Sequence, residues 1–159
     1  MTKQGNEQSF RPIIGIDLGT TNSAAAYIHQ GKSKMMAMTN DKQMIPSVVL
    51  KETSGKVVVG DEARSALVAM PKRTIAAIKR SMGEDVNVSL GDETYTPEEI
   101  SAFILKEIKH AADELLGEGE KEAVITVPAY FTDQQRQVSP PRKTAQASCS
   151  RGQSRSAYY

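Results

Sequence analysis

The stretch GIDLGTTNS, residues 15–23, concentrates groups that could bind an anion and a metal ion. Two glycines and three hydroxyl side chains surround a single aspartate, Asp17, directly after two isoleucines. A turn of small residues exposes consecutive backbone N–H groups, and aligned N–H groups bind oxyanions such as phosphate. A neighbouring carboxylate suits hydrated Mg²⁺, which proteins commonly hold through carboxylates, phosphate oxygens and water. On spacing alone, an ordinary Asp-Leu-Gly turn between two strands fits the pattern equally well.

Two common sequences for phosphate binding at a helix N-terminus are absent from the chain. Neither G-x-x-x-x-G-K-[ST] nor G-x-G-x-x-G occurs in the 159 residues. If the chain binds a nucleotide, it does so through the turn between two strands and not through a helix N-terminus.

The elements that position this turn are predicted from local patterns. Residues 12–17 and 23–28 read as two strands joined by the turn, and residues 34–38 as a third strand of an antiparallel meander. Residues 96–99, TPEE, form a capping box with proline at the first helical position, and apolar residues then recur at helical spacing until Gly117.

Residues 121–128 read as a buried strand rich in β-branched side chains. A helix between two strands of one sheet normally makes a right-handed parallel crossover, so this strand is expected to pair parallel to the first one. The ends of the two strands then lie side by side, where α/β folds place their ligands.

Residues 40–95 are predicted to be an inserted segment between the third strand and the long helix. It contains two strand-like runs, a helix expected to begin after Asp61, a second short helix and a small hairpin, at residues 46–50, 56–60, 62–70, 72–82 and 86–95. The element order predicts an α/β protein: an incomplete ribonuclease-H-like lobe, residues 12–39 and 96–137, that carries an inserted α+β subdomain.

Composition excludes several classes of protein. Hydrophobic residues make up 39% of the chain and charged residues 25%, and the net charge is +1, which favours neither a nucleic acid partner nor a membrane. The single cysteine, Cys149, fits a reducing cytoplasm, and the polar N-terminus, residues 1–11, is expected to be flexible and not a signal peptide. His29 and His110 are far apart in the sequence, so a histidine metal site is not expected.

An ordered series of motifs resembles the seventy-kilodalton heat-shock chaperone family, the DnaK type. IIGIDLGTTNS resembles the family's first phosphate motif; IPSVV, VVVGDEA, TIAAIKRSMG, YTPEEISAFIL and AVITVPAYFTDQQRQ follow in the family's order. The resemblance covers residues 13–137, and actins and sugar kinases share only the first motif. It implies an actin-like ATPase fold, ATP or ADP and Mg²⁺ as cofactors, and unfolded client polypeptides and co-chaperones as partners of the full-length family.

The resemblance also implies roles for individual residues. Asp17 would contact the metal through water, Lys79 would place the attacking water at the γ-phosphate, and the turn would hold the phosphates through Gly19, Thr20, Thr21 and Asn22. For Lys79 the plainer alternative is a solvated lysine beside Arg80. Pro128 and Arg136 match positions that relay the nucleotide state in the family. The plainer alternatives, a proline at a strand end and a surface arginine, are retained for these two.

The resemblance ends at Gln137. Residues 138–159 contain four basic residues, no acidic residue and the helix-breaking pair Pro140-Pro141. Their composition predicts a disordered tail, for which an out-of-frame reading is preferred over a basic arm.

Two functions therefore remain open. The chain is either the N-terminal fragment of an ATP-dependent chaperone in protein folding and the stress response, or a truncated chain without nucleotide turnover, at most a protein-binding module. Its own nucleotide affinity is expected to be weak and its turnover absent, since the family's second phosphate turn and adenosine pocket would lie beyond residue 159.

Overall fold

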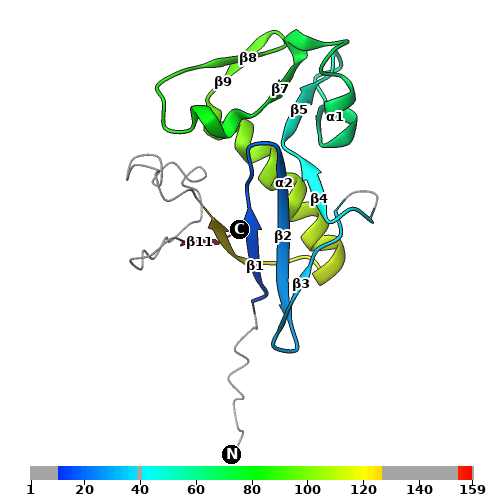
Figure 1. Ribbon diagram of the computed structural model, residues 1–159, viewed down its shortest axis with the longest axis vertical. Helices are drawn as coiled ribbons and strands as arrows, with labels where there is room; N and C mark the ends of the chain where they lie inside the picture. The colour runs from blue at the N-terminus through cyan, green and yellow to red at the C-terminus, as the bar shows by residue number, and fades with distance from the viewer. Residues whose placement is uncertain (1–10, 39–40, 127–153, 159) are drawn as a thin grey trace, which may run out of the picture.

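A computed structural model describes residues 11–38 and 41–126, together with the backbone of residues 154–158 (Figure 1). The main sheet has the strand order β11-β10-β1-β2-β3, and β4 pairs with β2 beside this path. Helix α2 lies across one face of the main sheet, and the smaller sheets of the inserted segment gather at one end of it (Figure 1).

The meander predicted for the start of the chain is confirmed. Strand β1 (Ile13–Asp17) pairs antiparallel with β2 (Asn22–His29), and β2 pairs antiparallel with β3 (Lys32–Met35). Strand β3 begins two residues earlier than expected because β2 and β3 are joined by a two-residue turn. Gln30 and Gly31 both have positive φ, 51° and 74°, as the tight hairpin turns that match strand twist require.

The predicted parallel strand is also confirmed. Strand β10 (Glu122–Thr126) pairs parallel with β1, and Asp17 lies opposite Thr126 at the carboxyl ends of the two strands. The connection between the meander and β10 runs through helix α2, as expected for a crossover.

Helix α2 (Pro97–Leu116) begins at the predicted capping box. The Glu99 N–H donates to Thr96 Oγ1 at 3.2 Å, and the Thr96 N–H donates to Glu99 Oε2 at 2.9 Å. Ile100, Ile104 and Ile108, at helical spacing, are at most 1% exposed and belong to the same core cluster as the buried face of β1 and β10. Within the described part of the chain, no helix has the length and apolar composition needed to span a membrane.

The inserted segment forms two small sheets and a short helix. Its elements are β4 (Met44–Pro46), β5 (Val48–Lys51), β6 (Val57–Val59), α1 (Asp61–Ser65), β7 (Thr74–Ala76), β8 (Val88–Leu90) and β9 (Glu93–Tyr95). The sheet order is β6-β5-β7, and β8 pairs with β9 as the predicted hairpin. Val49 and Leu90, both fully buried, join the cluster that contains Ile104, so the inserted segment and the main sheet share a continuous core.

One helix predicted in this segment is present but shorter than expected, and a second is wrong. Helix α1 ends at Ser65, and its N-cap is Gly60; Asp61 instead receives hydrogen bonds from Lys42 and Arg64. Residues 72–82 are not one helix but two short 3₁₀ turns around β7, because β7 finds a pairing partner in β5. Pairing with another strand overrides local helix propensity here.

The last described strand was not anticipated. Residues 138–159 were expected to lack structure, but β11 (Ser154–Tyr158) pairs antiparallel with β10. The edge of β10 presents unpaired N–H and C=O groups, which a neighbouring extended segment can satisfy whatever its composition. The capping box at residues 132–135 also predicts a helix that begins at Asp133. This helix lies outside the described residues, as do Pro128 and Arg136.

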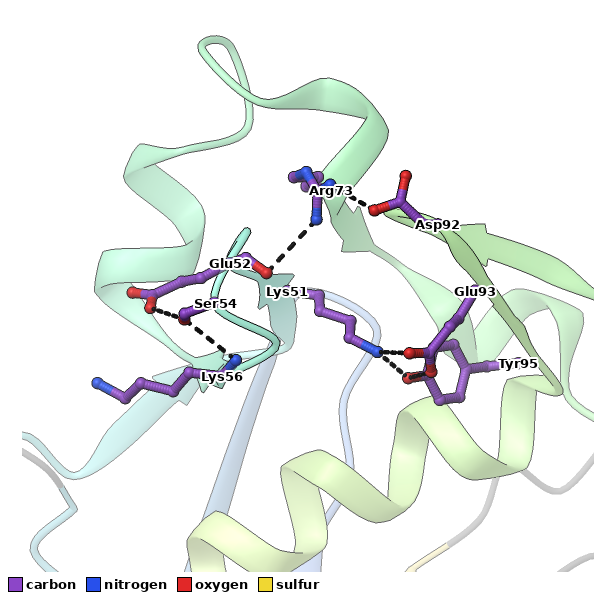
Figure 2. Close-up of polar contacts among 8 residues, drawn as sticks. All are labelled: Lys51, Glu52, Ser54, Lys56, Arg73, Asp92, Glu93 and Tyr95. Carbon is purple, nitrogen blue, oxygen red and sulfur yellow. Dashed lines mark hydrogen bonds and ion pairs between the residues drawn. The ribbon is translucent and has the colours of Figure 1, made fainter.

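A polar cluster fastens the β8–β9 hairpin to the β6-β5-β7 sheet (Figure 2). Lys51 Nζ lies 2.6 Å from Glu93 Oε1 and donates to the Tyr95 hydroxyl at 2.7 Å, while that hydroxyl donates to Glu93 Oε2 at 2.6 Å. Nearby, Arg73 pairs with Asp92 at 2.7 Å. Hydrogen bonds from Lys51 and then Tyr95 lower the pKa of Glu93 below its ordinary value.

This cluster predicts a specific pH dependence of stability. A carboxylate whose pKa is lower in the folded chain stabilises the fold above its unfolded pKa, and this stabilisation is lost as the pH falls through its folded pKa. We expect Glu93→Gln to lower the stability slightly at neutral pH and to flatten the loss of stability below about pH 4.5. Urea unfolding at a series of pH values measures this. Glu118→Gln is the control, because Glu118 has no ion-pair partner among the described residues; equal pH profiles for the two variants would contradict the prediction.

Candidate functional site

The turn between β1 and β2 is anchored in the core at its first residue and exposed to solvent at its end. Leu18, only 7% exposed, anchors it in the core, whereas Thr21 and Asn22 are exposed. Among the described residues, no backbone acceptor pairs with the N–H groups of Gly19, Thr20 or Thr21. Backbone N–H groups of this kind, close together in a turn of small residues, are ligands for an anion.

Glycine at position 19 is required by a close approach of the backbone to itself. A Cβ atom built on Gly19 would lie 1.9 Å from the carbonyl oxygen of Asn22 and 3.1 Å from its carbonyl carbon. No side chain can be accommodated without opening the turn. Gly15, two residues before Asp17, differs: a Cβ there would meet only the Ala26 oxygen, at 3.9 Å.

The inserted segment supports the turn from behind. Ser47, between β4 and β5, donates its N–H to the Thr21 carbonyl at 2.8 Å and its hydroxyl to the Gly19 carbonyl at 2.8 Å. Ser47 thus pairs with the carbonyl groups of Gly19 and Thr21, whereas the N–H groups of residues 19–21 have no backbone acceptor among the described residues.

Asp17 is oriented by a residue that sequence reasoning missed. Thr126, at the end of β10, donates its hydroxyl to Asp17 Oδ1 at 2.9 Å. The predicted parallel pairing carried the signal, because Asp17 and Thr126 are partners in the register of β1 and β10. Identifying Thr126 as the partner of Asp17 requires the exact register of the two strands, and the periodicity of the sequence does not give that register.

Lys79 lies on the 3₁₀ turn Ile78–Ser81, which directly follows Ala77, a residue with unusual backbone geometry. Ala77 has φ 56° and ψ 27°, in the left-handed region, and the next side chain, Ile78, is 6% exposed. Burial lowers the pKa of Lys79, and the charge of Asp17 acts in the opposite direction. The Lys79 residue is half-buried, and the charge of Asp17 acts on it.

The predicted site residues therefore fall into one region. Asp17 and residues 19–22 lie at the β1–β2 turn, and the charge of Asp17 acts on the pKa of Lys79, which comes from the inserted segment. A small cavity lies between α2 and the main sheet, and its lining includes Ile14, Ile16 and Leu105. Thr21 and Asn22 are exposed, so this part of the turn lies at the surface of the described structure.

The donor set fits magnesium only together with phosphate. Within the described residues, no three histidine, cysteine, aspartate or glutamate side chains converge to hold a metal ion. Asp17 supplies a carboxylate at the end of β1, so Mg²⁺ here would take most of its ligands from phosphate oxygens and water.

Comparison with known proteins gives consistent matches. The family model described as Hsp70 protein matches residues 13–90 and 84–145. Proteins named Chaperone protein DnaK from Thermotoga petrophila, Thermotoga maritima and Thermotoga neapolitana are each 47% identical over 128 residues, which cover 80% of this chain. The aligned part is 22% of each relative, so the chain spans about a fifth of the length of these curated proteins.

The geometry of Gly19 predicts a strong and local effect of adding a side chain. We expect Gly19→Ala to lower the free energy of unfolding by roughly 2 kcal/mol or more, because the turn must open to accept a Cβ atom. Chemical denaturation measures this, with Gly15→Ala as the matched control. Equal stability of the two variants would show that Gly19 is not constrained by the Asn22 carbonyl.

Because Lys79 is partly buried, we predict that its charge lowers the stability of the folded chain. Its folded pKa is lowered, so the unfolded chain binds more protons between that pKa and 10.5, and stability rises with pH in this window. We expect Lys79→Met to raise the unfolding free energy at neutral pH by roughly a few tenths of a kcal/mol, since the charge is lost and the apolar stem is kept. The gain should shrink toward about pH 10. Urea unfolding tests both points against Lys72→Met, an exposed control; a loss of stability in Lys79→Met alone would contradict the prediction.

Proposed function

Because this chain belongs to the Hsp70 family, we propose that it provides the first phosphate-binding turn of an ATP site in a molecular chaperone. The observation that carries the proposal is the β1–β2 turn. Its N–H groups have no acceptor among the described residues, its shape admits only glycine at position 19, and it lies beside Asp17. These properties suit the oxygens of a terminal phosphate.

Each residue of the turn has a proposed task. Gly19, Thr20, Thr21 and Asn22 bind the β- and γ-phosphates of ATP or ADP through backbone N–H groups and hydroxyls. Asp17, which accepts a hydrogen bond from Thr126, would hold Mg²⁺ through water. Bound Mg²⁺ would neutralise phosphate charge. The Asp17 carboxylate would contribute to holding the ion through water and not as a direct ligand.

Lys79 is proposed to act on the γ-phosphate. Phosphoryl transfer needs positioning and charge stabilisation more than covalent participation, and a cation near the turn supplies both. The partial burial of Lys79 strengthens its field, since fewer water molecules screen it. Its role is to hold the attacking water, and the charge of Asp17 opposes the lowering of the Lys79 pKa by burial.

The wider function is proposed from the family. The arrangement of the main sheet, with three antiparallel strands and a parallel fourth, fits the first lobe of an actin-like ATPase fold. A chaperone of this kind acts in protein folding and the stress response, with client polypeptides and co-chaperones as partners. The single cysteine fits the cytoplasm, where we place the protein.

The isolated 159-residue chain is proposed to bind nucleotide weakly and not to turn it over. Its turn is open to water, and electrostatic contacts are weaker in a solvated site than in an enclosed one. A non-enzymatic, protein-binding role has its own support: Ile13, Ile28 and Met35 are 46%, 53% and 47% exposed on the sheet face away from α2.

Amide NMR on the 159-residue chain tests the phosphate role directly. We expect Mg²⁺–tripolyphosphate to shift the N–H resonances of Gly19, Thr20 and Thr21, with a dissociation constant on the order of 1 mM or weaker. Mg²⁺–ATP should give the same pattern, since the contacts proposed here are to phosphate.

Lys79→Met should weaken this binding, and Lys72→Met should not. Absence of any shift at the turn, or shifts confined to other parts of the chain, would contradict the proposed function and favour the protein-binding role.

A further inference from the structure

Two buried serines lie directly behind the β1–β2 turn. Ser23, on β2, and Ser47, between β4 and β5, are 1% and 2% exposed. Their hydroxyl oxygens are 2.8 Å apart. Ser47 also contacts the turn twice, through its hydroxyl to the Gly19 carbonyl and through its N–H to the Thr21 carbonyl, both at 2.8 Å.

The direction of these hydrogen bonds follows from the number of protons. A serine hydroxyl has one proton to donate, and that of Ser47 is used on the Gly19 carbonyl. Ser23 must therefore donate to Ser47. The result is a buried chain of donors that runs from Ser23 through Ser47 to the Gly19 carbonyl, and hydrogen bonds in such a chain strengthen one another.

The Gly19 carbonyl shares its peptide plane with the N–H of Thr20. In a trans peptide the C=O and N–H groups point in opposite directions, so a bond that holds the carbonyl inward directs the N–H outward. The described bonds agree, since the Gly19 carbonyl is paired with Ser47 and the Thr20 N–H has no backbone acceptor among the described residues.

We propose that Ser47, supported by Ser23, is a positioning residue for phosphate binding that directs the Thr20 N–H toward the ligand. This inference rests on the proposed function of the turn. Ser47 does not touch the ligand in this role, because its hydroxyl is occupied by the Gly19 carbonyl and its side chain is buried. The inserted segment thereby takes part in shaping a site on the main sheet.

A control variant can separate the proposed positioning role from the loss of stability that follows when any buried hydroxyl is removed. Thr74, on β7, is 6% exposed and donates its hydroxyl to the Met70 carbonyl at 2.9 Å, in a different sheet. Thr74→Val removes a comparable buried hydrogen bond that does not involve the β1–β2 turn.

The test measures Mg²⁺–tripolyphosphate affinity by amide NMR, alongside urea unfolding, for Ser47→Ala, Ser47→Thr, Ser23→Ala and Thr74→Val. We expect Ser47→Ala to weaken binding roughly tenfold and to shift the Thr20 N–H resonance in the ligand-free chain, because the peptide plane loses its inward bond. Ser23→Ala should weaken binding about twofold to threefold, since Ser47 keeps its bond to Gly19. Ser47→Thr should restore affinity, and Thr74→Val should leave it unchanged.

Three results would overturn the inference. Affinity of Ser47→Ala equal to that of the unchanged chain excludes a positioning role while leaving the proposed function intact. An equal loss of affinity in Thr74→Val shows that general destabilisation is responsible. Absence of binding by the unchanged chain contradicts the proposed function and the positioning role together. If Ser47→Ala does not fold, Ser23→Ala decides, and unchanged affinity in that variant counts against the inference.

Discussion

The close approach of Gly19 to the Asn22 carbonyl is the constraint on which the candidate site depends. With 1.9 Å between a hypothetical Cβ and that oxygen, the chain reverses direction in a space too small for any side chain. This reversal brings β2 back along β1, and the N–H groups of residues 19–21 have no backbone acceptor among the described residues. A wider turn would connect the same strands but would spread these groups apart. The proposed binding surface is thus a property of backbone geometry, and the hydroxyl side chains of the turn would add to it.

The site is assembled by segments distant in the sequence that a single core holds together. Thr126 reaches Asp17 because β1 and β10 are parallel and in register, while Ser47 and Lys79 come from the inserted segment. Buried residues of α2, β1 and the inserted segment belong to one cluster, so these parts cannot move independently without loss of packing. The apolar interior therefore fixes the separation of polar groups that belong to different elements.

Local signals in the sequence predicted most of the regular structure. The capping box at Thr96 and the turn at residues 18–21 have stereochemical signatures that act over a few residues, and both are present. The parallel pairing of β10 followed from the handedness of crossovers. The region after Pro71 was mispredicted because its structure depends on a distant partner: β7 is a strand only beside β5.

The candidate site was predictable in kind but not in detail. Asp17 and the glycine-rich turn were visible as a pattern, and Lys79 entered only through a resemblance to a family. Thr126 and Ser47 were not visible, because an isolated hydroxyl has no local signature and its role depends on register and burial. Sequence patterns thus identify turns and other local backbone structures more readily than the single side chains that support them.

The left-handed backbone at Ala77 restricts which amino acids evolution can place there. At φ 56° a β-branched side chain would clash with its own backbone, whereas glycine or asparagine would adopt this conformation readily. Alanine is tolerated at a cost, and it keeps the preceding strand and the following 3₁₀ turn in a fixed relation. Among homologous chains, position 77 should therefore vary among small or amide-bearing residues while excluding valine, isoleucine and threonine, a pattern that would reflect backbone stereochemistry and not contact with any ligand.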